Sequence, residues 1–372
     1  MNFRTILSSL SIFAVVLACM SIVSCSKDPA PGTDPEVDPG MDPVETTVEE
    51  DKENIQTTLD NMLVCVDDMT SARAIDVLLR DFFEVSDGEA YNEEWTNDLT
   101  ANFEGVFDFE HIEENERFNI LHHGGRYYYD HTTQSWAKGQ AQLDFVTVQF
   151  PTSPDLTENN ANFVIDLYVD QAIILDGEEV YAPSRIHARL DVDNARLFEL
   201  NVANVTYDEN SSFEIPVEID ANLFLDPMEM SLDVVRNSST EFNAVIGFND
   251  GNSCNMSFEA DIALMDDDFE NLTEESIEKL HAKVRIGDLS IQSLAGLADL
   301  ISQDDPDEST INSLLDLDVL FKDLKIADLE YDEAEENFVL FYKDASSESA
   351  ASYIDDFLEK MEAMVVEFTG EW

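Results

Sequence analysis

The chain has 372 residues, of which 81 are Asp or Glu and 19 are Lys or Arg, so its formal net charge at pH 7 is −62. A field of this sign repels nucleic acids and anionic membrane surfaces, and we therefore expect no nucleic-acid partner. Hydrophobic residues make up 44% of the chain and 23 of them are Phe, which excludes a disordered acidic chain because such chains have little apolar surface to bury. We expect a folded body.

The first residues have the pattern of a secretory signal peptide. Arg4 supplies one positive charge, and an apolar stretch follows from Ile6 to Val23. Residues 22–25 then read Ile-Val-Ser-Cys, and polar residues begin directly after the cysteine. This segment resembles the bacterial lipobox, in which the cysteine receives diacylglycerol and becomes the first residue after cleavage. The resemblance implies a signal peptide over residues 1–24, lipid on Cys25 and attachment to a membrane through that lipid.

Two further positions bear on which cysteine carries the lipid and on which membrane holds it. Cys19 is the alternative lipid acceptor, but Leu17 suits the lipobox less well, and residues 20–23 would then remain as an apolar stub. Ser26 follows the favoured cysteine, and by the same resemblance it lacks the inner-membrane retention signal that Asp provides at this position. The resemblance implies a lipid anchor in the outer membrane of a Gram-negative cell, with the cell surface and the periplasmic face both open.

Residues 25–44 have the composition of a tether. Asp-Pro occurs four times between residues 28 and 43. Proline fixes φ and lacks the backbone donor, and the like charges repel one another, so this segment is predicted to be extended and unfolded. In polyproline II it would span up to roughly 60 Å. We interpret it as a spacer between the lipid and the folded body.

Residues 45–372 are predicted to form a single large α+β domain, which begins with two helices over residues 46–84. Their apolar residues are spaced by three, four or seven, as on one face of a helix. The first face is formed by Val48, Ile55, Leu59, Met62, Val66 and Met69, and the second by Ile75, Leu78, Leu79, Phe82 and Phe83.

Over residues 101–265 the apolar period changes to two, which predicts strands. Each strand carries one apolar and one charged face, and this is typical of an antiparallel sheet covered on one side. About ten consecutive strands imply a long, curved sheet, either a meander or half-barrel-like. The segments begin with Phe103, Phe107 and Phe109 and continue with residues 163–169, 186–192, 213–225, 228–234, 242–248 and 254–264.

Residues 273–342 are predicted to form a helical and hairpin region. Thr273 is a candidate N-cap for a helix with Ile277 and Leu280, and a second helix is predicted up to Ile301. Strands are predicted near Lys325–Tyr331 and Phe338–Tyr342. A C-terminal helix is predicted over residues 347–369. The terminal and inserted helices are expected to pack on the apolar face of the sheet, which gives an α+β fold.

The histidines suggest a metal site only under one arrangement of the strands. Four of the six histidines cluster in one segment. In a meander, His111, His123 and His131 could approach one another and bind a divalent metal together with Glu113 or Asp130. No fixed metal-binding spacing such as HExxH occurs, so scattered polar residues at strand ends are the favoured interpretation. No metal and no other cofactor is predicted.

Other candidate binding features are an aromatic segment and two acidic runs. Tyr127, Tyr129 and Trp136 are candidate ligand-binding residues, because flat aromatic faces suit sugar rings; aromatic pairs across a hairpin also stabilise a sheet without any ligand. The acidic runs at residues 265–276 and 302–310 do not have the EF-hand spacing, since Asn271 stands where that loop has Gly. They are interpreted as solvated loops.

After cleavage, Cys65 and Cys254 are the remaining cysteines. They can form a disulfide outside the cytoplasm or stay as buried free thiols, and the spacing leaves both open.

The sequence makes no positive case for an enzyme, since it contains no GxSxG, P-loop or dinucleotide motif, and no catalytic residue is predicted. The leading hypothesis is a non-enzymatic envelope lipoprotein that binds or scaffolds an envelope protein. A second is a carrier of a hydrophobic ligand, because a long sheet covered by helices resembles the half-barrel lipoprotein-carrier family, and Met228, Met230 and Met256 would suit an adaptable pocket. A third is a glycan-binding or glycan-active surface protein. The oligomeric state stays open.

Overall fold

The computed structural model describes residues 46–70, 74, 103, 106–115, 117–175, 178–207, 216–251, 254–266, 276–293, 298–301, 306–334 and 337–353. The signal peptide and the tether lie outside these residues. Strands account for 59% and helices for 18% of the structure, and the 16 strands belong to a long open antiparallel sheet. The predicted α+β class is therefore confirmed.

The chain, for which we expected one domain, divides into two compact units. Among the described residues, unit 1 comprises 46–67 and 230–353, and unit 2 comprises 68–229. We describe each unit by itself.

The elements described in unit 2 are two short helices and seven strands. Its hydrogen-bonded strand order is β7-β6-β5-β4-β3-β1-β2. Every pair is antiparallel except β1–β3, where the chain crosses over β2 and pairs in parallel. The elements are α5 (Phe109–Asn115), α6 (Ile120–His123), β1 (Gly125–Asp130), β2 (Ser135–Ala141), β3 (Val146–Phe150), β4 (Ala161–Leu175), β5 (Glu178–Val192), β6 (Ala195–Tyr207) and β7 (Pro216–Leu225).

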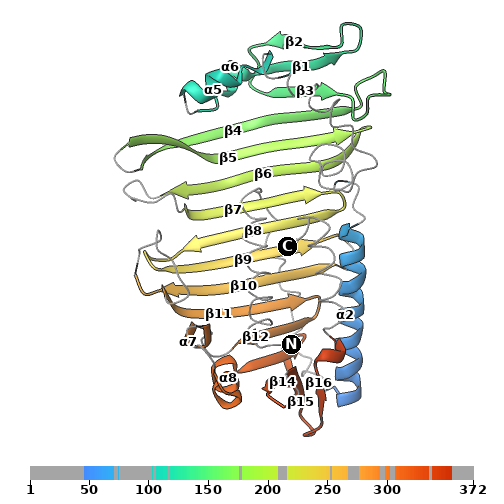
Figure 1. Cartoon of the computed structure of the whole chain (residues 1–372), viewed down its shortest axis with the longest axis vertical. Coiled ribbons are helices and arrows are strands. Elements are labelled where there is room, and N and C mark those ends of the chain that lie inside the picture. The colour runs from blue at the N-terminus through green and yellow to red at the C-terminus, as the bar shows by residue number, and fades with distance from the viewer. Residues whose placement is uncertain are drawn as a thin grey trace, which may run out of the picture. The chain divides into compact units, whose positions relative to one another are not determined.

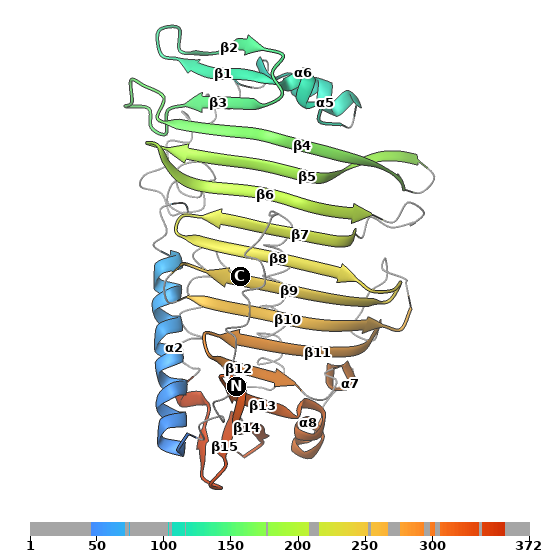
Figure 2. The same ribbon diagram turned by 180° about the vertical axis from the view of Figure 1, so that it is seen from behind.

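Unit 1 is a meander in which the strands from β8 to β16 are paired in chain order (Figures 1 and 2). Its long helix α2 lies beside the ends of these strands in both views. The elements are α2 (Val48–Thr70), β8 (Met228–Arg236), β9 (Glu241–Asn249), β10 (Asn255–Leu264), β11 (Ile277–Ile286), β12 (Leu289–Ser293), α7 (Ala298–Ile301), α8 (Glu308–Leu315), β13 (Leu317–Phe321), β14 (Leu324–Asp332), β15 (Asn337–Tyr342) and β16 (Ser347–Ser349).

Helix α2 is held by the core of unit 1. Val48 and Ile55 are seven residues apart and therefore lie on one helix face. Both are buried, and Ile55 is only 3% exposed. They pack against residues of strands β12 to β15, among them Leu289, Val319 and Leu340. Among the described residues, no helix combines the length and apolar composition needed to span a bilayer.

The strands predicted from period two between residues 161 and 264 are confirmed where the structure describes them, as are the strands near residues 325–331 and 338–342. The prediction of a strand from Phe103 is wrong, because Phe103 and Phe107 lie on helical turns and stack with ring centroids 5.2 Å apart. The spacing of four that joins these two rings also fits period two, so the alternation was ambiguous here.

The helix predicted with Ile277 and Leu280 is also wrong, because these residues begin strand β11. Ile291, predicted on the next helix, lies in β12, and among the described residues of that predicted helix Ala298–Ile301 are helical. The first residues of the predicted C-terminal helix, Ser347–Ser349, form strand β16 instead. The rest of that helix from residue 354, and the second N-terminal helix at residues 75–84, lie outside the described residues.

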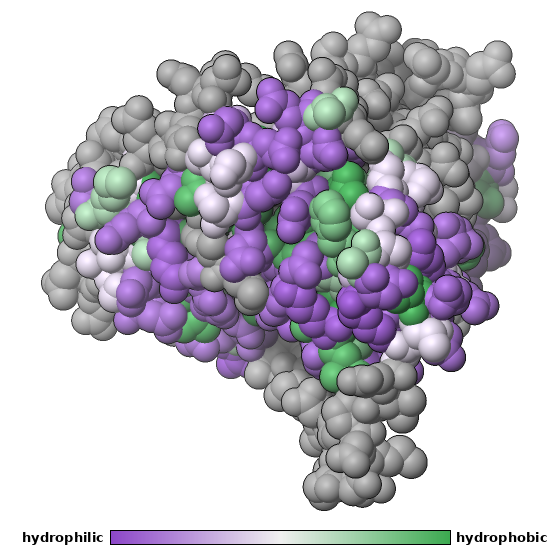
Figure 3. All heavy atoms as spheres, turned by 90° about the horizontal axis from the view of Figure 1, so that it is seen from below, coloured by the Kyte–Doolittle hydropathy of each residue, from purple (hydrophilic) through white to green (hydrophobic). Residues whose placement is uncertain are grey.

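The surface agrees with the acidic composition. Figure 3 views the molecule from the end at which Figure 1 shows β14 and β15, and hydrophilic residues predominate among the described atoms on that face. Apolar residues occur there as separate small groups.

Candidate functional sites

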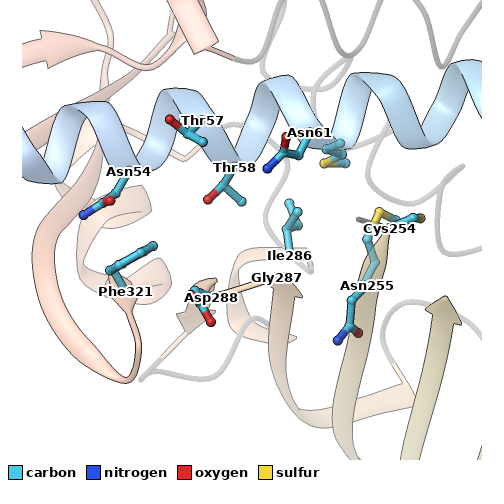
Figure 4. Close-up of a pocket in the computed structure, with 12 residues that line it drawn as sticks. Asn54, Thr57, Thr58, Asn61, Cys254, Asn255, Ile286, Gly287, Asp288 and Phe321 are labelled. Carbon is cyan, nitrogen blue, oxygen red and sulfur yellow. The ribbon is translucent and has the colours of Figure 1, made fainter. Parts of the chain in front are cut away.

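A pocket of about 350 Å³ lies in unit 1 between helix α2 and the ends of strands β10, β11 and β13 (Figure 4). This volume falls at the lower end of the range of small-molecule sites. Every residue that lines it belongs to unit 1. The lining consists of Asn54, Thr57, Thr58, Asn61 and Met62 from α2, Cys254, Asn255 and Met256 around the start of β10, Ile286, Gly287 and Asp288 at the β11–β12 turn, and Phe321 at the end of β13.

The helix supplies the polar side of the pocket. Asn54, Thr58 and Asn61 are spaced by four and three residues, so they share one helix face. Figure 4 shows all three pointing from α2 toward the strand ends. Met62 follows on this face and is buried, whereas Asn54 and Thr58 are half-buried. The helix thus presents amide and hydroxyl groups to the pocket and no formal charge.

The opposite side combines an aromatic ring with one carboxylate. Phe321 is half-buried, and Lys322 Nζ lies 5.3 Å from the centre of its ring. Asp288 Oδ2 lies 3.5 Å from Lys322 Nζ, so the carboxylate at the rim has a cationic partner. Gly287 adopts φ +55°, the left-handed conformation that lets the β11–β12 turn form beside the pocket.

Cys254 forms the buried end of the pocket and is disulfide-bonded. A free thiol at this position, one of the two alternatives left open by the sequence, is therefore wrong. The side chain of Cys65 lies outside those that the structure describes. The turn before Cys254 is fixed by side-chain oxygens: Gly251 N donates to Asn249 Oδ1 at 2.7 Å, and Cys254 N donates to Asp250 Oδ1 at 2.9 Å.

The N-terminal part of α2 is fastened to the β15–β16 hairpin by Glu348. Lys52 Nζ donates to its Oε2 at 2.7 Å, and the hydroxyls of Tyr342 and Tyr353 donate to its Oε1 at 2.5 and 2.6 Å. Burial raises the pKa of Glu348, but these three donors outweigh it and the net shift is downward. Burial and the bond to Glu348 raise the pKa of Tyr353 to about 12.

A second ion pair lies at the same end of the helix. Asp51 in the first turn of α2 is fully buried, and its Oδ2 lies 3.4 Å from Lys343 Nζ. Its other oxygen accepts a short hydrogen bond from the hydroxyl of Thr46. The two ion pairs fix the position of α2 along the strands and with it the polar face that lines the pocket.

The predicted aromatic binding residues lie in the core of unit 2. Tyr127 is fully buried, and its hydroxyl donates to the backbone oxygen of His123 at 2.5 Å. Trp136 is only 8% exposed and packs against Phe103 and Tyr129. Tyr129 itself is half-buried. The exposure that a sugar-stacking platform needs is thus missing at Tyr127 and Trp136, because these rings fill the space under the helical turns around Phe107.

A cluster of charged and imidazole groups lies nearby in unit 2. One ligand atom each from Asp108, His111 and His122 lies within 4.8 Å of the other two. His122 Nε2 is 2.9 Å from Asp108 Oδ2, and this hydrogen bond is the main cause that lowers the pKa of Asp108. The rings of His111 and His122 stack with centroids 3.8 Å apart.

The residues of this cluster differ from those of the metal site considered from the sequence, which were His111, His123 and His131. His111 joins the cluster, but His123 points into the core, where its Nδ1 lies 2.9 Å from the backbone oxygen of Phe107. Burial lowers the pKa of His123 more than this bond raises it. His131 lies elsewhere, with its Nε2 3.0 Å from Asn159 Oδ1. Asp130 is not a member of the cluster, and the side chain of Glu113 lies outside those that the structure describes.

Unit 2 also carries a row of ion pairs across β4, β5 and β6. Arg189 donates to Asp166 at 2.6 Å, and Arg196 Nε donates to Asp191 at 2.7 Å. His187 lies between Asp166 and Glu199, with its Nε2 2.9 Å from the latter. All five side chains with a carboxylate or guanidinium are between 25% and 35% exposed. The row neutralises charge on one face of the sheet.

No protein-family model matches the chain, and neither a curated protein nor a solved structure matches it. Function is therefore argued from the chemistry of the two sites.

Proposed function

We propose that this chain is a lipid-anchored lipoprotein of the outer membrane whose folded body binds a small neutral sugar in the pocket of unit 1. The observation that carries the binding role is the pocket lining, in which three uncharged hydrogen-bonding side chains of α2 face Phe321 and aliphatic groups. Sugars require this combination, because their hydroxyls pair with amides and hydroxyls while their CH faces pack on an aromatic ring.

The lining favours a sugar over an acyl chain. Asn54 and Thr58 are half-buried and would lose their hydrogen bonds to water when a lipid tail fills the pocket, and each uncompensated group costs about 1–3 kcal/mol. A charged ligand is disfavoured as well, because α2 contributes no charge and Asp288 already faces Lys322. A hydrophobic-ligand carrier remains the alternative function, and its signature is a bound lipid in the purified protein.

The cellular location is proposed from the N-terminal residues and is supported by the cysteine chemistry. The segment before Cys25 resembles a lipobox, and Ser26 fits export to the outer membrane. The disulfide at Cys254 supports a location outside the cytoplasm, since disulfides persist in oxidising compartments. The proposed membrane contact is the lipid alone.

Ligand binding is tested on the full chain by calorimetric titration with a panel of neutral mono- and disaccharides. Asn61→Leu is expected to weaken the best sugar about tenfold, the loss that follows from about one hydrogen bond. Gln56→Leu is the matched control, because Gln56 is another exposed amide of α2 that does not line the pocket and donates to Asp60 instead. An equal loss in both variants, no binding of any neutral sugar, or a lipid found by native mass spectrometry contradicts the proposal.

Anchoring is tested separately by labelling cells with a fatty-acid analogue. Cys25→Ser is expected to abolish the label and release the protein from the membrane, and Cys19→Ser is expected to leave both unchanged. The opposite pattern would move the lipid to Cys19.

A further inference from the structure

The cluster of Asp108, His111 and His122 in unit 2 has the composition of a metal site. It offers two imidazole nitrogens and one carboxylate oxygen, all within 4.8 Å of one another. Imidazole nitrogen is the ligand that zinc, copper and nickel prefer, whereas calcium and magnesium prefer oxygen ligands.

The local backbone holds these three side chains together. Asp108 adopts φ +66° at the turn before α5, a conformation that Asp tolerates better than most residues. His111 N donates to the backbone oxygen of Asp108 at 3.3 Å, which keeps the two residues in one turn. On the other side, Asn119 caps α6 by accepting from the backbone N–H groups of Leu121 and His122.

The neighbouring His123 anchors the cluster to the core. Its side chain is fully buried, and its ring stacks on those of Phe107 and Phe118. Because His123 is fixed, the exposed ring of the preceding residue His122 is directed to the surface beside Asp108 and His111. The Nε2 atom of His123 is buried and has no hydrogen-bond partner among the described residues. The ring centre of His123 lies 4.8 Å from that of His122 and 5.8 Å from that of His111.

We propose that Asp108, His111 and His122 bind one divalent transition-metal ion, with Zn²⁺ as the best fit. With Zn–N bonds of about 2.0–2.1 Å, two ligands of a tetrahedral site are about 3.4 Å apart. His122 Nε2 and Asp108 Oδ2 are 2.9 Å apart and are already close to this separation. The stacked rings of His111 and His122 must tilt so that both nitrogens point to one ion.

Three protein ligands leave the fourth position of a tetrahedral ion open. Asp108 and His122 are exposed and His111 is half-buried, so water or an external ligand reaches this position. The chain's net charge of −62 raises the local concentration of cations around the site. The site is independent of the sugar pocket, since no residue is shared and the two lie in different units.

The test is a Zn²⁺ titration of the full chain against a competing chelator, in excess Mg²⁺ to occupy unspecific carboxylate sites. One tight site per chain is expected. His111→Gln and His122→Gln are each expected to weaken it at least 100-fold. His131→Gln is the matched control, because His131 is a half-buried histidine of the same unit that bonds to Asn159 instead, and it is expected to leave the affinity unchanged.

Two further measurements separate ligand loss from misfolding. The melting temperatures of all variants in EDTA are expected to agree within a few degrees, because the substituted rings lie at the surface. Co²⁺ added to the unsubstituted chain is expected to give visible absorption bands of a four-coordinate site that disappear on adding Zn²⁺. Equal Zn²⁺ affinity in the His122→Gln and His131→Gln variants, or octahedral Co²⁺ bands alone, would overturn the proposal.

Discussion

The pocket of unit 1 is lined mainly by uncharged groups of helix α2 and the strand ends, with Asp288 as the one carboxylate among the described lining residues, whereas the cluster of unit 2 consists of ionisable groups on short helices and a turn. Ile55 and the Glu348 ion pair fix α2, so the pocket is formed before any ligand binds. In contrast, His111 and His122 are stacked and must tilt to share an ion. A preformed pocket of this kind therefore selects its ligand by shape and hydrogen bonding, whereas an adjustable cluster of ionisable groups selects by the chemistry of its ligand atoms.

The largest effect is expected when the support of the pocket is removed. Ile55→Ala deletes a fully buried branch between α2 and the sheet and should lower the free energy of unfolding by about 3 kcal/mol. Sugar binding should weaken with it, while Zn²⁺ affinity at the cluster should not change. Chemical denaturation and the two titrations measure this.

Val64→Ala is the matched control, because Val64 lies on the same helix and is 50% exposed. A loss of stability in this control as large as that of Ile55→Ala would show that α2 is not held by the face we describe.

The disulfide at the end of the pocket should contribute about 2–4 kcal/mol. Asn61 and Met62 of α2 line the same pocket as Cys254, and Cys65 follows one turn later in the sequence. Peptide mapping without reduction is therefore expected to find Cys254 joined to Cys65, and Cys254→Ser should lower the unfolding free energy by that amount. Alkylation of Cys254 before reduction would contradict both expectations.

Glu348→Gln tests the second support of α2. Replacing a carboxylate that accepts three hydrogen bonds should cost about 2 kcal/mol at pH 7. Because the pKa of Glu348 is lowered in the folded state, its contribution is present above the unfolded pKa and is lost as the pH falls through the folded pKa. The difference between the two proteins should therefore shrink in acid.

Denaturation curves at pH 7 and pH 3 measure this difference. Glu330→Gln is the control, because Glu330 is an exposed carboxylate on strand β14 of the same unit. A cost that stays constant between the two pH values would mean that the charge of Glu348 is not what holds the helix.

The strands could be predicted from the sequence because one face of each is charged, so period two is visible from β4 to β10. Strand β11 carried the same signal, since Leu280, Ala282, Val284 and Ile286 alternate and pair with β10. The spacing of three between Ile277 and Leu280 fits a helix, and the alternation that follows was therefore not interpreted as a strand. At Phe103 and Phe107 the spacing of four residues fits both the period of a strand and the period of a helix. In the folded chain the two rings stack on each other, and both residues are helical.

The sites were harder to predict because their residues come together only in the folded chain. The pocket combines four separate segments, and the polar spacing of Asn54, Thr58 and Asn61 was its only signal in the sequence. His122 and His123 are adjacent, and nothing local indicates which one enters the core. In the folded chain it is His123 that enters the core, where its ring stacks on that of Phe107.

The smallest effect is expected in the ion-pair row of unit 2, which sharpens the contrast with Glu348. Arg189 donates to Asp166 at 2.6 Å, but both side chains are about a third exposed, and pairs of this kind contribute about 0.5 kcal/mol. Arg189→Gln should therefore change the unfolding free energy by about that amount at low salt and by less in 1 M NaCl, where exposed charges are screened. Arg185→Gln, at an exposed position of the same strand, should have no effect at either salt concentration. A salt-independent cost above 2 kcal/mol for Arg189→Gln would contradict this expectation. It would mean that these ion pairs are shielded from solvent and stabilise the fold as Glu348 does.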